Sequence, residues 1–255
     1  MSVRAEVADF WDEHTRAWLA GEDPMPDPLP RWYASYTGRG AGAVTREGFA
    51  EPYGGDLRGQ ARVVTLGLNP GRAELDFQAR RGIFAGQLRS GSYSAWARSW
   101  PYLSSQWERS KGRNRYTRSR LEFGRRWFED PALAPDDVLL MELYPWHSTR
   151  VTAKIIPPPE IIDRFIWQPL AEHPPDFIFA FGKDWLEVCR GLRLPEVGRW
   201  GQGGLDIGST VASRAVAAFA LPSQQWVVVC WQSGYAGPPG SEDTRRIREA
   251  LTAVR

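Results

Sequence analysis

The residues best suited to chemistry in this 255-residue chain form the segment Gly67-Leu68-Asn69-Pro70-Gly71. An apolar, β-branched run from 63 to 68 leads into it and is typical of a strand buried on both faces. Gly67 and Gly71 allow backbone angles closed to other residues, and Pro70 fixes φ. Ligands bind beyond the carboxyl ends of parallel strands. The turn is therefore predicted to hold the Asn69 amide rigidly against a ligand.

A second candidate is a long basic and aromatic insertion, about 88–128, far longer than an ordinary connection between strands. Its cations outnumber its acids, since Glu122 alone opposes eight Lys and Arg between Arg109 and Arg126. Aromatic residues lie on or just before this segment: Tyr93, Trp96, Trp100, Tyr102, Trp107 and Tyr116. Positive charge interleaved with aromatics suits a phosphate backbone with unstacked bases. The alternative is a solvated helix face with core aromatics.

The elements that must position these residues alternate between strands and helices. Short apolar runs predict strands over 63–68, 137–144, 176–181 and 225–231. Helical spacing predicts helices over 3–19, 119–128, 159–171, 184–190 and 242–254. This alternation favours an α/β fold with helices on both faces of a parallel sheet. We expect an N-terminal helix and irregular extension over 1–60, packed on one α/β domain over 61–255.

The turn sequence Gly-Leu-Asn-Pro-Gly resembles the first motif of the uracil-DNA glycosylase superfamily, in its mismatch-specific and single-strand-selective branches. The resemblance covers roughly residues 61–255 and implies a three-layer α/β/α sandwich around a central four-stranded parallel sheet. It also implies that Asn69 holds the attacking water. An amide is a poor general base, so charge stabilisation would come from phosphates and nearby carboxylates, Asp76 or Glu74.

Two further segments carry the resemblance. Gly82-Ile83-Phe84-Ala85-Gly86 resembles the element whose Phe stacks on the extruded base, which gives Phe84 that role. Trp231-Gln232-Ser233-Gly234 stands where the second motif usually reads His-Pro-Ser or Asn-Pro-Ser. It keeps the Ser and, as in the mismatch-specific branch, a following Gly, but it loses both the His and the Pro. The lost His normally stabilises the departing uracil anion, which argues against efficient uracil removal. A surface loop without a catalytic role is the alternative for this second segment.

Glu142 stands where uracil-reading members place an Asn. A carboxylate only accepts hydrogen bonds, so it would repel the O4 of uracil and accept from the amino group of cytosine. Glu142 therefore favours a cytosine-type base, unless it simply pairs with an Arg. His147, five residues later, is a candidate base-binding residue that could also be structural. The remaining candidates are DNA-binding: Arg72, Arg81, Lys111, Arg113, Arg115, Arg118, Ser233, Gly234 and Tyr235.

Composition bounds the rest. The net charge is +2, so any argument for nucleic acid depends on local clustering. Two Cys are too few for a four-thiolate cluster, and the three His show no metal-ligand spacing. We expect no metal and no cofactor. No long apolar run or secretory signal is present, so we expect a cytoplasmic protein without a membrane span. We also expect a monomer.

These observations favour a monofunctional DNA glycosylase that extrudes a base, hydrolyses its N-glycosidic bond and leaves an abasic site. Because removal of normal cytosine would destroy the host genome, the favoured target is a modified cytosine. The superfamily is thought to include anti-phage members that remove glucosylated hydroxymethylcytosine from phage DNA. The alternatives are a repair glycosylase for uracil or mismatched thymine and a non-catalytic reader of modified or single-stranded DNA. A nucleoside hydrolase is disfavoured, because a free nucleoside offers no phosphate to the Arg cluster.

Overall fold

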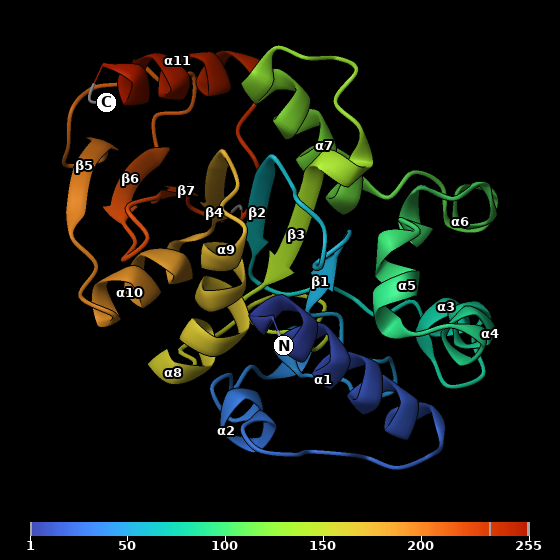
Figure 1. Ribbon diagram of the computed structural model, residues 1–255. Coiled ribbons are helices and arrows are strands. Elements are labelled where there is room, and N and C mark those ends of the chain that lie inside the picture. Colours follow the sequence, from blue (N-terminus) through green and yellow to red (C-terminus); the bar gives the residue numbers. More distant parts are fainter. Residues whose placement is uncertain (1, 235, 254–255) are drawn as a thin grey trace. The chain divides into compact units, whose positions relative to one another are not determined.

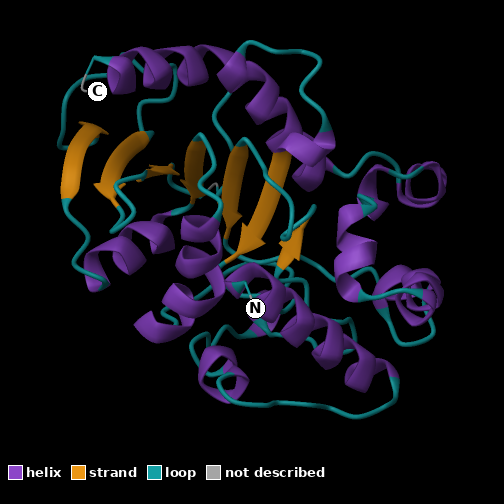
Figure 2. Cartoon of the chain, viewed as in Figure 1, coloured by secondary structure: helices purple, strands orange, loops and turns teal. Residues whose placement is uncertain are grey.

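The computed structural model describes residues 2–234 and 236–253. The chain forms two compact units, each discontinuous in sequence. Unit 1 comprises Met1–Gln60, Leu68–Pro101 and Leu139–Pro174, and unit 2 comprises Ala61–Gly67, Tyr102–Val138 and Pro175–Arg255. Both units combine helices with strands (Figures 1 and 2), which confirms the predicted α/β class.

Unit 2 contains a mixed set of five strands. β2 (Val63–Gly67), β4 (Phe177–Phe181) and β7 (Trp226–Trp231) pair in parallel, in that order. β6 (Ala215–Ala220) pairs antiparallel with β7, and β5 (Glu196–Gly201) pairs antiparallel with β6. The residues of β2 are all buried, as their apolar run predicts. The sheet is therefore mixed, whereas the sequence indicated parallel strands alone.

The three parallel strands of unit 2 end at one edge. Phe181, the last residue of β4, lies opposite Cys230 of β7. The indole Nε1 of Trp185 donates to the carbonyl of Gly67, at the end of β2, over 2.9 Å. Trp185 belongs to α10 (Lys183–Gly191), the helix that directly follows β4. This hydrogen bond fixes the start of α10 against the carboxyl end of β2, at the edge where α/β proteins bind ligands.

The other helices of unit 2 include the predicted C-terminal helix and most of the basic insertion. They are α6 (Ser105–Lys111), α7 (Arg115–Phe128) and α11 (Ser241–Thr252), with 3-10 turns at Pro101–Leu103 and Pro135–Asp137. α7 begins four residues before the predicted start at 119, because the Asn114 side chain caps it by accepting from the Thr117 N–H over 2.9 Å.

Unit 1 is mainly helical. Its helices are α1 (Val3–Leu19), α2 (Leu29–Tyr33), α3 (Leu75–Gln78), α4 (Ile83–Ser90), α5 (Tyr93–Arg98), α8 (Pro159–Ile162) and α9 (Gln168–Glu172). A 3-10 turn covers Gly40–Gly42, and a π-helical turn at Asp163–Trp167 joins α8 to α9. β1 (Tyr53–Gly54) pairs antiparallel with β3 (Val138–Glu142). The predicted helix over 159–171 is thus present with a wider turn at its centre.

The N-terminal helix of unit 1 is anchored by a buried arginine. The guanidinium of Arg4 donates to the carbonyls of Pro169 over 2.6 Å, His173 over 2.7 Å and Leu57 over 3.2 Å, and also to Gly59. These carbonyls belong to α9, to the residue after it and to the segment after β1. Four acceptors satisfy the desolvated charge, so the beginning of the chain is fixed to segments distant in sequence.

The sequence missed the antiparallel strands for identifiable reasons. β6 reads Ala-Val-Ala-Ala-Phe-Ala, and alanine has a low preference for strands. β5 contains two glycines, which weaken a strand pattern. Both strands form through pairing: β6 lies between β5 and β7, and its first five residues are buried. All four predicted strands and all five predicted helices are present, with shifted ends.

Candidate functional site

The predicted turn fixes the Asn69 amide through a hydrogen-bonded neighbour. Asn69 is 9% exposed, and its Nδ2 donates to the hydroxyl of Ser148 over 2.9 Å and to the Ser148 carbonyl over 3.3 Å. Gly71 adopts φ +83°, which favours glycine. With Nδ2 engaged, Oδ1 makes no hydrogen bond within the described residues. The geometry thus leaves an acceptor, as the orientation of a water molecule requires.

His147 connects this turn to a segment far away in sequence. The ring is fully buried, with Nδ1 3.2 Å from the carbonyl oxygen of Gly71 and Nε2 3.1 Å from that of Phe49. Nε2 also lies 3.5 Å from Oε1 of Glu51. A neutral imidazole has one N–H and can donate to one of these oxygens, whereas the cationic ring can donate on both sides. In this structure His147 supports the turn from inside the protein.

Glu51 and Gln78 complete the support, and sequence reasoning missed both. The Gln78 side chain donates to Glu51 and accepts from the backbone N–H of Glu74. Both side chains are buried, although they come from an irregular segment and from a four-residue helix. No periodicity or motif marks Glu51 in the sequence. Its role emerges from the fold, which brings residues 49–51 beside 71–78 and 147.

Glu142 is buried at the end of β3, where its backbone N–H donates to the Pro52 carbonyl over 2.9 Å. Tyr93, also buried, lies close to this carboxylate. Burial raises the pKa of Tyr93 well above its ordinary value, and the charges of Glu51 and Glu142 raise it further. The unit therefore holds two buried carboxylates around one phenol, of which the sequence identified Glu142.

Phe84 belongs to an aromatic cluster inside unit 1. Its ring centroid lies 5.1 Å from that of Phe77 and 5.4 Å from that of Trp96, both edge-on. Trp96 in turn contacts Phe49 at 4.9 Å. Phe84 is 1% exposed, so its ring is covered by this cluster. Asn69, Phe84 and Glu142 thus all belong to unit 1.

Three other predicted residues of unit 1 lie at its surface. Arg72 is exposed, with Nε 4.0 Å from a carboxylate oxygen of Glu74. Asp76 is exposed in the first turn of α3, and Arg81 is exposed before α4. Exposed cations after the turn fit contacts with phosphate. The exposed position of Asp76 is compatible with an ordinary surface residue and with a catalytic carboxylate.

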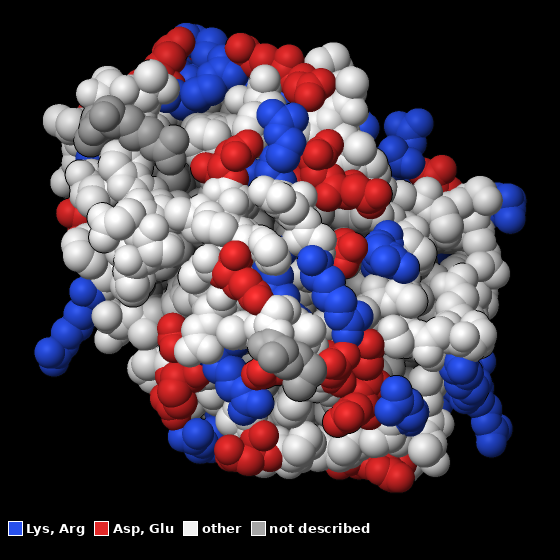
Figure 3. Space-filling view, in the orientation of Figure 1, with Lys and Arg blue, Asp and Glu red and all other residues white. Residues whose placement is uncertain are grey.

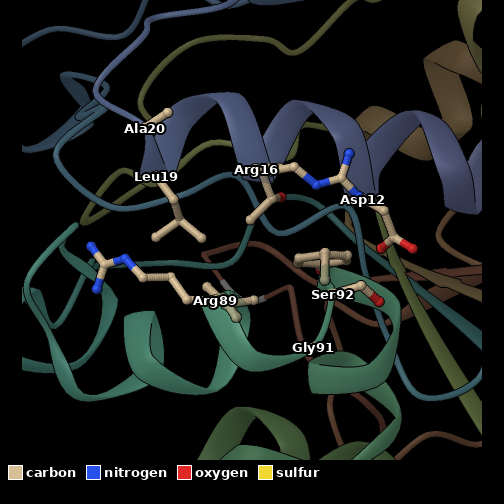
Figure 4. A pocket seen from close by; sticks show the side chains of 10 residues that line it. Asp12, Arg16, Leu19, Ala20, Arg89, Gly91 and Ser92 are labelled. Carbon is tan, nitrogen blue, oxygen red and sulfur yellow. The ribbon is translucent and has the colours of Figure 1, made fainter.

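A hollow of about 310 Å³ lies elsewhere in unit 1, between α1 and the segment from α4 to α5 (Figure 4). Its lining includes Asp12, Arg16, Leu19 and Arg89. Asp12 accepts from both the backbone N–H and the hydroxyl of Ser94, over 2.7 and 2.8 Å. The Arg89 guanidinium points away from the hollow (Figure 4). The hollow is lined by neither the Asn69 turn nor Glu142, so it differs from the predicted base slot.

The predicted DNA-binding residues of unit 2 fall into two groups. Lys111, Arg113 and Arg115 are exposed around the start of α7, and Arg118 is half-buried and pairs with Glu108. Ser233 and Gly234 are exposed after β7, and Tyr235 lies outside the described residues. Trp231, the last residue of β7 and the first residue of the second motif, is buried.

The buried ion pair between Arg214 and Asp243 orients Gln232. In the sequence, Gln232 stood out only as a departure from the second motif. Arg214 donates from Nε to Asp243 over 2.7 Å and from Nη2 to the Gln232 side-chain oxygen over 3.0 Å. Burial acts to raise the pKa of Asp243, but hydrogen bonds from Thr210, Ser209 and Arg214 hold it below its ordinary value. Because its oxygen is held, the Gln232 amide presents its NH₂ group as a donor.

On the face drawn in Figure 3, acidic and basic side chains are interspersed, in keeping with the small net charge. Within residues 2–234 and 236–253, no helix has the length and apolar character needed to cross a membrane. The same residues contain no group of three or more His, Cys, Asp or Glu side chains arranged to hold a metal ion.

In comparisons with known proteins, no protein-family model matches the chain, and no curated protein matches it with significance.

Proposed function

We propose that this protein is a monofunctional DNA glycosylase of the uracil-DNA glycosylase superfamily, with that fold's three-layer arrangement around four parallel strands. Its favoured substrate is glucosylated hydroxymethylcytosine in phage DNA, and its product is an abasic site. The observation that carries the proposal is the Asn69 turn. It follows a buried parallel strand, and its amide is fixed through Nδ2 with Oδ1 left as an acceptor.

In the proposed reaction, Oδ1 of Asn69 accepts a hydrogen bond from water and directs the water oxygen toward the sugar C1′. The base departs as an anion with the electrons of the N-glycosidic bond, and the sugar passes through an oxocarbenium-like state. The water oxygen bonds to C1′ and loses one proton to solvent, and the departed base takes up one proton from solvent. Asn69 accepts no proton, so rate enhancement depends on position and on nearby negative charge, with Asp76 and the DNA phosphates as its sources. Ser148 and His147 act as positioning residues, because they hold the turn.

Base recognition is assigned to Glu142 and Phe84. The buried carboxylate accepts from the exocyclic amino group of a cytosine-type base, and the ring of Phe84 stacks on that base once its cluster opens. A base must leave the stack to be reached, which costs a few kcal/mol. His147, predicted to contact the base, is assigned instead to support of the turn, since both ring nitrogens already face protein oxygens.

Contacts with the DNA backbone are assigned to exposed cations and to the loop after β7. These residues are Arg72, Arg81, Lys111, Arg113, Arg115, Arg118, Ser233, Gly234 and Tyr235. The proposed enzyme acts as a cytoplasmic monomer and uses neither metal nor cofactor.

The first experiment incubates the protein with glucosylated phage DNA, with uracil-containing duplex and with unmodified duplex, and detects abasic sites as alkali-induced strand breaks. Breaks in the glucosylated DNA alone support the proposal, and breaks in the uracil duplex alone contradict it. Asn69→Ala should lower the rate by at least about a hundredfold while DNA affinity stays nearly constant. Ser209→Ala, a change in unit 2 outside the proposed catalytic residues, serves as the control.

The second experiment tests the base-reading role of Glu142. Glu142→Asn introduces the residue that uracil-reading members carry at this place. It should shift preference from the cytosine-type base toward uracil by roughly tenfold or more, because one hydrogen-bonding pair discriminates by about 1–3 kcal/mol. An unchanged ratio of the two rates would remove Glu142 from base recognition.

A non-catalytic reader of modified or single-stranded DNA is the second candidate. The burial of Phe84 favours it, since this ring is already packed inside the protein. A reader would bind DNA without forming abasic sites, and Asn69→Ala would then change little.

A further inference from the structure

Arg120 of α7 is a buried cation whose hydrogen-bonding capacity is largely unused. The residue is 1% exposed. Its Nη1 makes a long hydrogen bond of 3.4 Å to the Tyr116 carbonyl, and its Nε and Nη2 have no hydrogen-bond partner within the described residues. The guanidinium carbon lies 3.4 Å from the ring centroid of Tyr116 and 5.7 Å from that of Phe181. Aromatic faces engage the flat side of a guanidinium, while its N–H groups point along the plane.

The two unused nitrogens form one functional edge. The Nε–H and one N–H of Nη2 point in the same direction, which is the fork that binds two oxygens of a single anion. The same protein uses this edge elsewhere: Arg199 donates from Nε and Nη2 to the two carboxylate oxygens of Glu196, each over 2.6 Å. At Arg120 the same fork is present and buried, and neither of its nitrogens has a hydrogen-bond partner within the described residues.

Packing places this fork at the ligand-binding edge of unit 2. Trp127 contacts Phe177 at 5.1 Å, and Phe123 contacts Phe181 at 5.2 Å, so α7 runs antiparallel to β4. One turn further toward the start of α7, Arg120 lies beside Phe181, the last residue of β4. Arg120 is thus at the carboxyl ends of the parallel strands, where α/β proteins bind their ligands.

The surrounding charge favours a phosphate over a neutral ligand. The first turn of α7 contains no acidic residue and starts with Arg115, although the positive end of a helix dipole disfavours cations. Arg113 and Arg115 are exposed beside it. An oxyanion bound there would offset both the helix dipole and these charges, and would supply the two acceptors that the Arg120 fork lacks.

We propose that Arg120 is the core of a phosphate-binding site, in which one phosphate group accepts from Nε and Nη2. The exposed cations at the start of α7 draw the phosphate in, and the half-buried Tyr116 ring covers the guanidinium face. The phosphate is either a DNA backbone phosphodiester or a free phosphate. Phosphate binding at this site does not require base excision, so it can be tested separately from the proposed glycosylase activity.

The test measures two affinities of the full chain: that for inorganic phosphate, by calorimetry, and that for a single-stranded oligonucleotide, by fluorescence anisotropy. Arg120→Met should weaken at least one of them by roughly tenfold to a hundredfold, as expected for loss of a charged hydrogen-bonding pair. Loss with the oligonucleotide alone identifies the backbone as the source, and loss with inorganic phosphate identifies a free phosphate. Sodium acetate in place of phosphate should give no comparable binding.

Arg125→Met is the matched control, because Arg125 lies on the same helix and its guanidinium is satisfied by Glu122 and by the Leu133 carbonyl. It should change neither affinity more than about twofold. Arg120→Lys keeps the charge without the fork, so this variant should also bind the phosphate group more weakly. It provides the test if the methionine variant folds poorly. Wild-type affinities in both Arg120 variants, or acetate binding equal to phosphate binding, would overturn the proposal.

Discussion

Two buried arginines of this protein, Arg4 in unit 1 and Arg120 in unit 2, differ in how many of their N–H groups have hydrogen-bond partners. In unit 1, Arg4 is 2% exposed and donates to four backbone carbonyls from three segments of the chain. In unit 2, Arg120 is equally buried but makes one long hydrogen bond to the helix that carries it. Both side chains lose their hydration on folding, yet Arg4 alone regains its hydrogen bonds within the protein.

The difference separates structural from ligand-binding charge. A desolvated guanidinium without partners costs several kcal/mol, so a protein that retains one must recover that cost elsewhere. Arg4 recovers it by joining α1 to distant backbone. Arg120 lacks such partners, which is why we infer a bound phosphate. The Asn69 turn combines both situations, because Ser148 accepts from Nδ2 while Oδ1 makes no hydrogen bond within the described residues.

The same substitution in both regions should give the largest contrast. Arg4→Met removes the donor from four carbonyls, two of them in buried hydrogen bonds, and should lower the free energy of unfolding by about 3–5 kcal/mol. Urea denaturation followed by tryptophan fluorescence measures this change. A loss below about 1 kcal/mol would mean that Arg4 contributes no more than an exposed arginine, and the comparison would fail.

The second largest effect should be a loss of stability at acid pH, caused by His14 on α1, the helix that carries Arg4. Burial lowers the pKa of His14, on α1, to about 4 from its ordinary 6.5. The folded state therefore favours the neutral ring, and the unfolded state takes up the proton first as the pH falls. The stability conferred by the neutral ring is complete above pH 6.5 and is lost as the pH falls toward 4.

His14→Gln should remove this dependence. Between pH 7 and pH 4 the wild type should lose roughly 3 kcal/mol more free energy of unfolding than the variant. Denaturation series at several pH values give both slopes, with the carboxylate contribution common to the two proteins. Parallel curves would show that His14 keeps an ordinary pKa in the folded protein.

Ser148→Ala sharpens the assignment of the Asn69 turn. It removes the hydroxyl that accepts from Nδ2 and should cost about 1 kcal/mol of stability. If the protein is a glycosylase, kcat should fall while KM stays constant, because Asn69 loses its orientation and not its contact with DNA. A raised KM at constant kcat would place Ser148 in binding instead.

Arg120→Met should have the smallest effect on stability, within about 1 kcal/mol of the wild type and in the stabilising direction when phosphate is absent. Thermal unfolding in a phosphate-free buffer measures this, and added phosphate should stabilise the wild type alone. A destabilisation similar to that of Arg4→Met would show that Arg120 already has its partners in the folded chain.

The sequence predicted five helical segments and the four apolar strands, because periodicity and buried runs report local preference. It did not predict the short helices α2 to α6. It also predicted that Asn69 lies in a rigid turn, since Gly, Pro and Asn specify turn geometry locally. It did not predict β5 or β6, whose alanines and glycines carry no strand signal and which form through pairing with neighbours.

Tertiary structure alone decided which polar side chains have partners. Ser148, Glu51 and Gln78 lie far from Asn69 in sequence or carry no motif, and they meet its turn because the chain folds back on it. Arg120 is one of eight similar cations between Arg109 and Arg126, and nothing in its residue type sets it apart. Burial and hydrogen-bond satisfaction arise from contacts between distant segments, so only the fold distinguishes a solvated arginine from one poised for a ligand.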